Sequence, residues 1–224
     1  MAQYSGVTDS MNHSGPNHPG GAMELSDDLV EQTIRFHGHS CPGLAIGIRA
    51  AELALQDIGR ADDEDILAVV ETDMCGVDEI QFLTGCTFGK GNLIHLDYGK
   101  NAFTFYRRRD GKAIRLVTRS EVMGPRDDTV VALREKEAAG ESLSPEEQER
   151  LQQAVDARTH YVMDAALEEI FDIQPVSTPA PKPARIMNSV SCEACGEDVM
   201  ESRTRQFMGQ TLCIPCFNLR EQRW

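Results

Sequence analysis

Two histidines and a cysteine stand within five positions at the start of an apolar stretch: His37, His39 and Cys41. Imidazole nitrogens and thiolates are the donors that zinc and related transition metals prefer in proteins. Cys41 directly precedes Pro42, a residue type favoured in the first turn of a helix. The unpaired N–H groups of a helix start stabilise a thiolate. The spacing therefore predicts a metal-binding or nucleophilic thiol at Cys41, with His37 and His39 as co-ligands or bases.

A second stretch, ETDMCGVDEIQFLTGCTFGKGNL (71–93), begins at the end of a predicted strand and contains Cys75 and Cys86. Thiols beside glycines and polar residues are atypical of inert core packing, so both are expected as further ligands or as a resolving pair. The glycines around Lys90 do not match a phosphate loop, because the spacing is one residue short and no Ser or Thr follows the lysine. A small anion nest and a plain glycine-rich turn both remain open for this loop.

Four further cysteines form two Cys-x2-Cys pairs near the C-terminus, with 17 residues between the pairs. Such pairs can surround one zinc ion tetrahedrally, and four protein ligands leave no open position for a substrate. A segment with so few large apolar residues needs such a staple in order to fold. We therefore expect one structural zinc ion, with a protein or nucleic acid as the open alternatives for the partner of this module. The ligands are Cys192, Cys195, Cys213 and Cys216.

The elements that position these residues follow from periodicity and capping. Ser26 is a plausible N-cap for a helix that stops before Gly38, and a second helix runs from about residue 42 to 58. Residues 66–73 and 92–99 have the pattern of strands, and residues 102–118 that of a hairpin with an Asp-Gly turn. Polar helices follow over about 127–139 and from Ser144, where Glu147 completes a capping box. Gly43 and Gly47 predict close approach of another backbone.

Composition bounds the class of protein. Residues 1–174 hold 31 acidic and 16 basic residues, whereas residues 175–224 hold 5 and 6. The acidic body argues against nucleic-acid binding by the main domain, because phosphates would be repelled. The sequence contains no run of 18 apolar residues, so no membrane-spanning helix is expected. The first residues lack the pattern of a secretory signal. Seven cysteines without an export signal favour a reducing, cytoplasmic location.

The order of helices, strands and helices favours an α+β core followed by a treble-clef or zinc-ribbon-like module. The stretch 174–185 contains four prolines and predicts a semi-rigid extended linker. His13 and His18 lie in a Gly- and Pro-containing leader that is expected to be disordered. The expected organisation is a leader at 1–22, the core at 23–173, the linker at 174–187 and the zinc module at 188–224.

Three segments carry a resemblance to a known family: FHGHSCPGLAIGIRAAELAL, DMCGVDEIQFLTGCTFGKGNL and DYGKNAF. They resemble the FmdE family, named for the FmdE component of molybdenum or tungsten formylmethanofuran dehydrogenase, over roughly residues 25–170. Some members of that family carry a C-terminal zinc finger. The resemblance implies an α+β core that is usually dimeric, with a site around His37, His39, Cys41, Cys75 and Cys86. Gln81 and Lys90 match motif positions and are expected to line that site.

The leading hypothesis is therefore a cytoplasmic protein whose core Cys/His cluster binds a second transition metal, zinc among the candidates, or performs thiol chemistry. The resemblance links it to molybdenum- or tungsten-dependent one-carbon metabolism, with a partner in a dehydrogenase complex. The alternative is a non-catalytic adaptor whose zinc module recruits a protein or nucleic acid. An enzyme needs an open coordination position and a pocket, whereas an adaptor needs neither.

Overall fold

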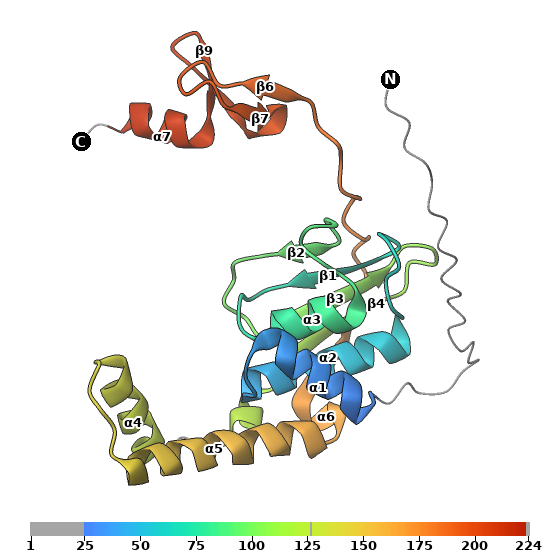
Figure 1. Cartoon of the computed structure of the whole chain (residues 1–224). Helices are drawn as coiled ribbons and strands as arrows, with labels where there is room; N and C mark the ends of the chain where they lie inside the picture. Colours follow the sequence, from blue (N-terminus) through green and yellow to red (C-terminus); the bar gives the residue numbers. More distant parts are fainter. Residues whose placement is uncertain (1–24, 126, 223–224) are drawn as a thin grey trace, which may run out of the picture.

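The computed structural model describes residues 25–125 and 127–222. The leader expected at 1–22, with His13 and His18, lies outside the described residues. Figure 1 shows the chain. Its helices are α1 (Asp27–His37), α2 (Pro42–Asp57), α3 (Gly76–Thr84), α4 (Asp128–Ala138), α5 (Pro145–Asp164), α6 (Leu167–Ile170) and α7 (Ile214–Glu221), and the short 3-10 helices are η1 (Ser120–Met123) and η2 (Glu201–Arg203). Its strands are β1 (Ile66–Val70), β2 (Leu93–His95), β3 (Ala102–Arg107), β4 (Ala113–Thr118), β5 (Phe171–Pro175), β6 (Ser189–Ser191), β7 (Asp198–Met200), β8 (Thr204–Phe207) and β9 (Gln210–Cys213).

The core is a five-stranded sheet in the order β2-β1-β3-β4-β5, with α1, α2 and α3 layered on one side of it (Figure 1). β1 and β2 are parallel, and α3 forms the crossover between them, whereas all other neighbouring strands are antiparallel. β1 is buried throughout because both faces of the sheet are covered. Ala68 and Val70 pack under α2, and Leu67 and Val69 face the opposite side. This arrangement confirms the predicted α+β class.

Capping fixes the helix starts as the sequence predicts. Ser26 accepts a hydrogen bond from the Leu29 N–H and begins α1, and Gly38 ends it with a φ of 99°. Ser144 and Glu147 form the expected capping box at the start of α5. Asp127 caps α4 by accepting from the N–H groups of Thr129 and Val130. The α1 and α2 boundaries place the HGHSC stretch in the short connection between two packed helices.

The glycines of α2 serve a contact within the chain. A Cβ atom built on Gly47 would lie 2.4 Å from the Cα and carbonyl oxygen of Gly76, at the start of α3. A Cβ atom on Gly43 would lie 3.4 Å from the Cβ of Cys75. The predicted close backbone approach is confirmed, and its consequence is that Cys75 is brought beside the start of α2. The glycines therefore give no reason to expect a second copy of the chain at this face.

The proline-rich segment is extended, as predicted, but its first part is packed against the core. Residues 174 and 175 belong to β5, and Val176 and Ala180 cover Leu67 on the sheet face opposite α2. Further along, the Ala184 N–H donates to a carboxylate oxygen of Glu64 at 3.2 Å. Sequence periodicity misses this packing because isolated small apolar residues between prolines have no repeat to detect. The segment thus leaves the core only after residue 184.

The C-terminal module is built from two small hairpins, β6–β7 and β8–β9, followed by α7. Its own apolar cluster joins the buried residues Cys192, Leu212 and Cys213 to the partly buried Val199 and Phe217. Phe207 and Phe217 pack edge to face with ring centroids 5.6 Å apart. This is the hairpin-and-helix arrangement expected for the zinc module. Across the described residues, the helices are all too short or too polar to cross a membrane.

Candidate metal centre

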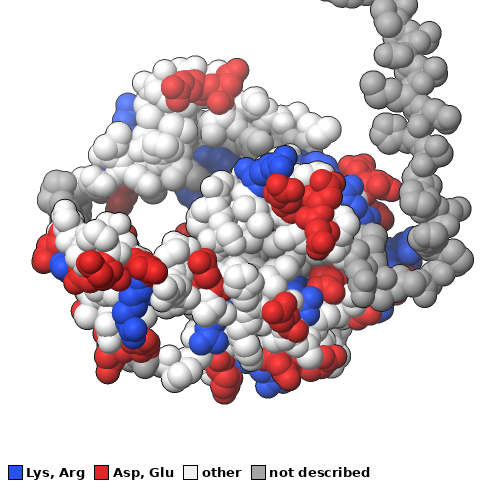
Figure 2. Space-filling model, turned by 60° about the horizontal axis from the view of Figure 1, so that its bottom comes forward, with Lys and Arg blue, Asp and Glu red and all other residues white. Residues whose placement is uncertain are grey.

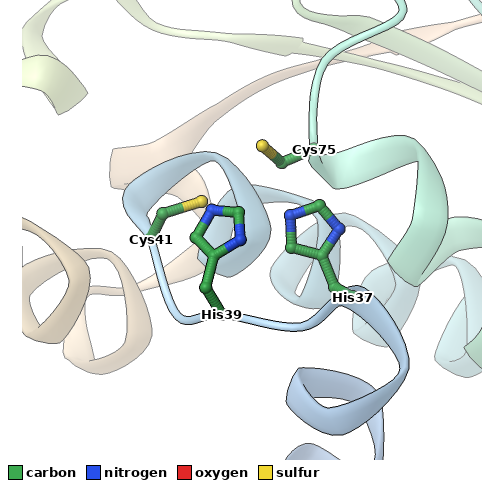
Figure 3. A group of neighbouring side chains, drawn as sticks. All are labelled: His37, His39, Cys41 and Cys75. Carbon is green, nitrogen blue, oxygen red and sulfur yellow. The ribbon is translucent and has the colours of Figure 1, made fainter.

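Four of the sequence-predicted residues converge at the mouths of three helices (Figure 3). His37 is the last residue of α1, His39 lies in the following loop, Cys41 caps α2 and Cys75 precedes α3. One ligand atom from each residue lies within 4.8 Å of those of the other three. The left-handed turn at Gly38 reverses the chain between the two histidines, and their ring centroids are 4.5 Å apart. The fold therefore brings together four of the five residues expected around the core site.

His37 is oriented by a carboxylate. Its Nδ1 lies 2.8 Å from Oδ2 of Asp78, which fixes the ring and leaves Nε2 as the free donor atom. Nε2 is buried and has no hydrogen-bond partner in the described part of the chain. A buried nitrogen left without a partner is costly, whereas a metal ion at Nε2 would satisfy it. The carboxylate–histidine arrangement is the usual outer shell of a histidine ligand.

The sulfur atoms of Cys41 and Cys75 point toward each other beside the two histidine rings (Figure 3). The Sγ atom of Cys41 accepts a hydrogen bond from the Leu44 N–H at 3.3 Å. Burial, followed by the hydrogen bond and charge of Cys41, raises the pKa of the Cys75 thiol. A cation beside the two sulfurs would counter this rise in the pKa of Cys75.

The donor set of two sulfurs and two imidazole nitrogens is typical of tetrahedral zinc. The four residues differ in exposure: His39 is exposed, whereas His37, Cys41 and Cys75 are half-buried. With an ion bound by all four residues, His39 would therefore be the ligand most easily displaced by an incoming molecule. Without it, one histidine and two cysteines would remain, a ligand set that catalytic zinc sites combine with an open fourth position.

A pocket of about 410 Å³ adjoins the cluster. His37 and Cys75 line it, together with the exposed His95 at the end of β2. Asp73 and Asp78 are its acidic residues, and its lining within the described chain includes neither lysine nor arginine. The pocket therefore suits a neutral or cationic small molecule more than an anion.

The structure places Cys86 away from the cluster, contrary to the expectation from its glycine-rich surroundings. Its side chain is fully buried in the apolar core, and Sγ lies 3.7 Å from the carbonyl oxygen of Ile66. Burial raises the pKa of the Cys86 thiol to about 11, so the thiolate needed for metal binding is disfavoured. Gln81 and Lys90, the two residues expected to line the site, do not both lie at the pocket beside it. Gln81 lines the pocket beside the cluster, whereas Lys90 lines a different cleft.

The sequence alone singled out neither Asp78 nor Glu79 as a functional residue. Asp78 follows Cys75 by three positions, so helical spacing places both on one face of α3, and this spacing is the signal that was available. Glu79 is fully buried, and neither of its carboxylate oxygens has a hydrogen-bond partner among the described residues. Burial raises the pKa of Glu79 to about 8.

Glu79 should make the stability of the protein fall as the pH rises. The folded state holds the proton up to about pH 8, whereas the unfolded state releases it near the ordinary value of 4.5. Unfolding therefore releases a proton between these values, and the linked loss of folding free energy is on the order of 3 kcal/mol. Glu79→Gln should flatten this dependence and raise the melting temperature at pH 8. Melting curves from pH 5 to 8 test it, with the exposed Glu31→Gln as the control. An unchanged slope in Glu79→Gln would contradict the assignment.

The second cluster lies in the C-terminal module, where the four cysteine sulfurs also lie within 4.8 Å of one another. Backbone N–H groups, first that of Cys195 and then that of Cys213, lower the pKa of Cys192 to about 6. The hydrogen bond to Cys213 raises the pKa of Cys216 to about 12. One thiolate is thus pre-formed, and the next needs a neighbouring positive charge. These residues fit a zinc ion held by four thiolates.

Acidic side chains are spread widely over the face shown in Figure 2, with lysines and arginines interspersed among them. On this face the basic residues form no continuous surface. Nucleic-acid binding needs such a surface in order to neutralise several phosphates at once. The distribution agrees with the acidic balance of the core sequence.

Comparison with known proteins gives the family. Residues 36–172 match the family model described as FmdE, molybdenum formylmethanofuran dehydrogenase operon. Residues 185–222 match the prokaryotic dksA/traR C4-type zinc finger. A solved structure from Syntrophus aciditrophicus, of a protein named as tungsten formylmethanofuran dehydrogenase FmdE-like, superposes with a TM-score of 0.55. That superposition covers 88% of this chain and 94% of the other at 24% identity, and it shows the shared fold.

A protein of Archaeoglobus fulgidus, named as a probable S-adenosyl-L-methionine-binding protein, is 36% identical over 195 residues. The match covers 84% of this chain and 52% of the relative, so the chain spans about half the length of the curated relative it matches. The family match covers more than half of the chain and includes the complete Cys/His cluster of the core. The chain therefore belongs to the FmdE family and carries a C4 zinc finger after its core.

Proposed function

We propose that the core binds one transition-metal ion, with zinc as the first candidate, and presents it to a small molecule in the adjoining pocket. His37, Cys41 and Cys75 would hold the ion, and His39 would be the exchangeable fourth ligand. The observation that carries the proposal is the buried His37 Nε2, which lacks a partner among the described residues while Asp78 fixes the other ring nitrogen. Zinc at this position would supply Lewis-acid chemistry.

The protein's own residues would then bind and orient the ligand. Asp78 holds the His37 ring through Nδ1, at an exposed edge of the pocket. His95 also lines the pocket and offers an imidazole that can hydrogen-bond a bound molecule. Phe88, with 75% of its surface exposed, offers an apolar wall that a bound molecule would cover. Such covering excludes water from the cluster.

The biological setting is part of the proposal. We propose that the protein acts in the cytoplasm, in one-carbon metabolism linked to molybdenum- or tungsten-dependent formylmethanofuran dehydrogenase, with a protein partner from such a complex. The support is the FmdE family name together with seven free cysteines, which suit a reducing compartment. Metal analysis of the purified protein tests the core of the proposal, which requires metal beyond that of the zinc finger.

The ligand that we place first in the pocket is S-adenosyl-L-methionine, the compound in the name of the Archaeoglobus fulgidus relative. Its positively charged sulfur suits a pocket with two carboxylates and, among the described residues, no lysine or arginine. Calorimetry should show binding that Asp73→Asn weakens about tenfold, as expected for loss of one opposite charge. S-adenosyl-L-homocysteine, whose sulfur is neutral, serves as the matched ligand. Equal affinity for the two compounds would contradict the charge argument.

We also propose that the protein is a homodimer, on the strength of its family. Light scattering of the full chain at micromolar concentration should then give twice the chain mass of 24.8 kDa. A monomer mass at that concentration would contradict the proposal. The glycines of α2 give it no separate support, because they serve a contact within the chain.

The adaptor alternative is favoured by a different observation. Met200, Met208 and Leu219 of the zinc module are exposed by 54%, 89% and 74%, as a protein-binding surface would be. In that account the Cys213→Ser protein should lose a partner that the native protein captures, while Cys41→Ser retains it. The metal-and-pocket proposal instead predicts that Cys41→Ser loses binding of the small molecule and that Cys213→Ser retains it.

A further inference from the structure

A second cleft, of about 660 Å³, lies on the other side of Gln81 from the Cys/His pocket. Its lining comes from α1, from the end of α2 with the following loop, from α3 and from the 85–90 loop. It shares only Gln81 with the pocket beside the cluster, and it contains no member of that cluster. The Gln81 side-chain oxygen accepts the Phe88 N–H at 3.1 Å and thereby ties the 85–90 loop to α3. The two cavities are therefore separate places for a ligand.

Two cations reach this cleft from different segments. Arg60 lies after α2, and its Nε donates to the carbonyl oxygen of Leu83 at 3.1 Å, which positions the guanidinium and leaves its two terminal NH2 groups available. Lys90 lies in the 85–90 loop. Neither residue takes part in an ion pair within the described part of the chain. In a core with nearly twice as many acidic as basic residues, two such cations beside one cleft are suited to an anion.

The rest of the cleft suits a flat ring and hydroxyl groups. Phe36 is 56% exposed at the cleft, and its ring packs against Phe82 with centroids 5.3 Å apart. A supported and exposed aromatic ring is a stacking surface for a base or another planar group. The exposed Asp62 and the Gln32 amide also line the cleft and can pair with hydroxyl groups or ring edges.

We propose that this cleft binds a nucleoside phosphate, with the base against Phe36, the phosphates between Arg60 and Lys90, and a sugar hydroxyl on Asp62. Asp62 would repel a bare phosphate, so the site favours an anion that also carries hydroxyl groups and a ring over inorganic phosphate or pyrophosphate. The site does not depend on the metal cluster, and its ligand occupies a different cavity.

Calorimetry of the full-length protein with ADP, adenosine and inorganic pyrophosphate tests the proposal. ADP should bind more tightly than either of the other two, because only ADP uses both the ring and the cations. Arg60→Gln and Lys90→Gln should each weaken ADP binding by about tenfold or more, equivalent to about 1.4 kcal/mol. Phe36→Ala should weaken ADP and adenosine but leave pyrophosphate unchanged. Arg109→Gln, which removes an exposed charge from the β3–β4 turn, is the matched control.

All four variants should retain a cooperative melting transition and the metal content of the native protein, which separates this test from the outcome of the metal proposal. Three results would each contradict the proposal that this cleft binds a nucleoside phosphate. They are no ADP binding at millimolar concentration, equal loss of affinity in Arg109→Gln, or pyrophosphate binding as tightly as ADP.

Discussion

Replacing Cys213 with serine will release about one zinc ion per chain and unfold the C-terminal module. Cys213 is buried at the end of β9 and belongs both to the sulfur cluster and to the small apolar core of the module. Structural zinc contributes roughly 10–16 kcal/mol of apparent binding free energy in small modules, far more than so small an apolar core provides. Metal analysis and limited proteolysis check the result, and new cleavage sites should lie between residues 185 and 222.

The core should melt as before in the Cys213→Ser protein. The apolar cluster of the module contains no residue of the sheet or of α1–α6, and the strap formed by residues 176–184 stays with the core. If the Cys213→Ser substitution lowered the melting temperature of the core as much as a large-to-small substitution in the core does, the core and the module would not be independent. Retention of all zinc after the substitution would show that the four cysteines do not hold it.

Replacing Cys41 with serine should abolish the proposed metal binding by the core with little loss of fold. Serine retains the N-cap position of α2, because its oxygen accepts a backbone N–H as Cys41 Sγ does. It does not replace the thiolate that the ion requires. Metal content should therefore fall by one equivalent, and the melting temperature of metal-free protein should change little. Combining Cys41→Ser with Cys213→Ser should leave the chain without bound metal.

Two matched variants sharpen this prediction. Asp78→Asn should weaken core metal binding by about 10–100-fold while leaving all four ligands in place, since it perturbs only the orientation and basicity of His37. Cys86→Ala removes a thiol that lies in the apolar core and should leave core metal binding unchanged. Loss of core metal in Cys86→Ala but not in Cys41→Ser would reverse the assignment of the two thiols.

Local signals predicted much of this fold. Ser26, Ser144 and the Asp110–Gly111 turn act through neighbouring residues, so sequence alone locates the ends of α1, α5 and the β3–β4 hairpin. β5 was missed because its pairing partner, β4, lies more than fifty residues away. The packing of the strap at 176–184 could not be predicted for the same reason. Its contacts are all with distant residues.

The candidate site also has a part that local sequence predicts and a part that depends on contacts between distant segments. His37, His39 and Cys41 are close in sequence, so their convergence follows from one helix end and one helix start. Cys75 joins them only because Gly47 and Gly76 let α3 approach α2, a contact between distant segments. Cys75 and Cys86 have similar surroundings in sequence, yet Cys86 is buried within the apolar core while Cys75 belongs to the Cys/His cluster. The two thiols lie at opposite ends of α3, and the composition around a thiol does not tell which of them is buried in the core.

Anomalous X-ray diffraction at the zinc absorption edge, on crystals of full-length protein purified without chelator, tests the central claim most directly. The account predicts two zinc sites per chain. One should lie among Cys192, Cys195, Cys213 and Cys216, and the other within bonding distance of His37 Nε2, Cys41 Sγ and Cys75 Sγ. A single zinc site in the C-terminal module, with His37 Nε2 bound to no metal at any other absorption edge, would contradict the account.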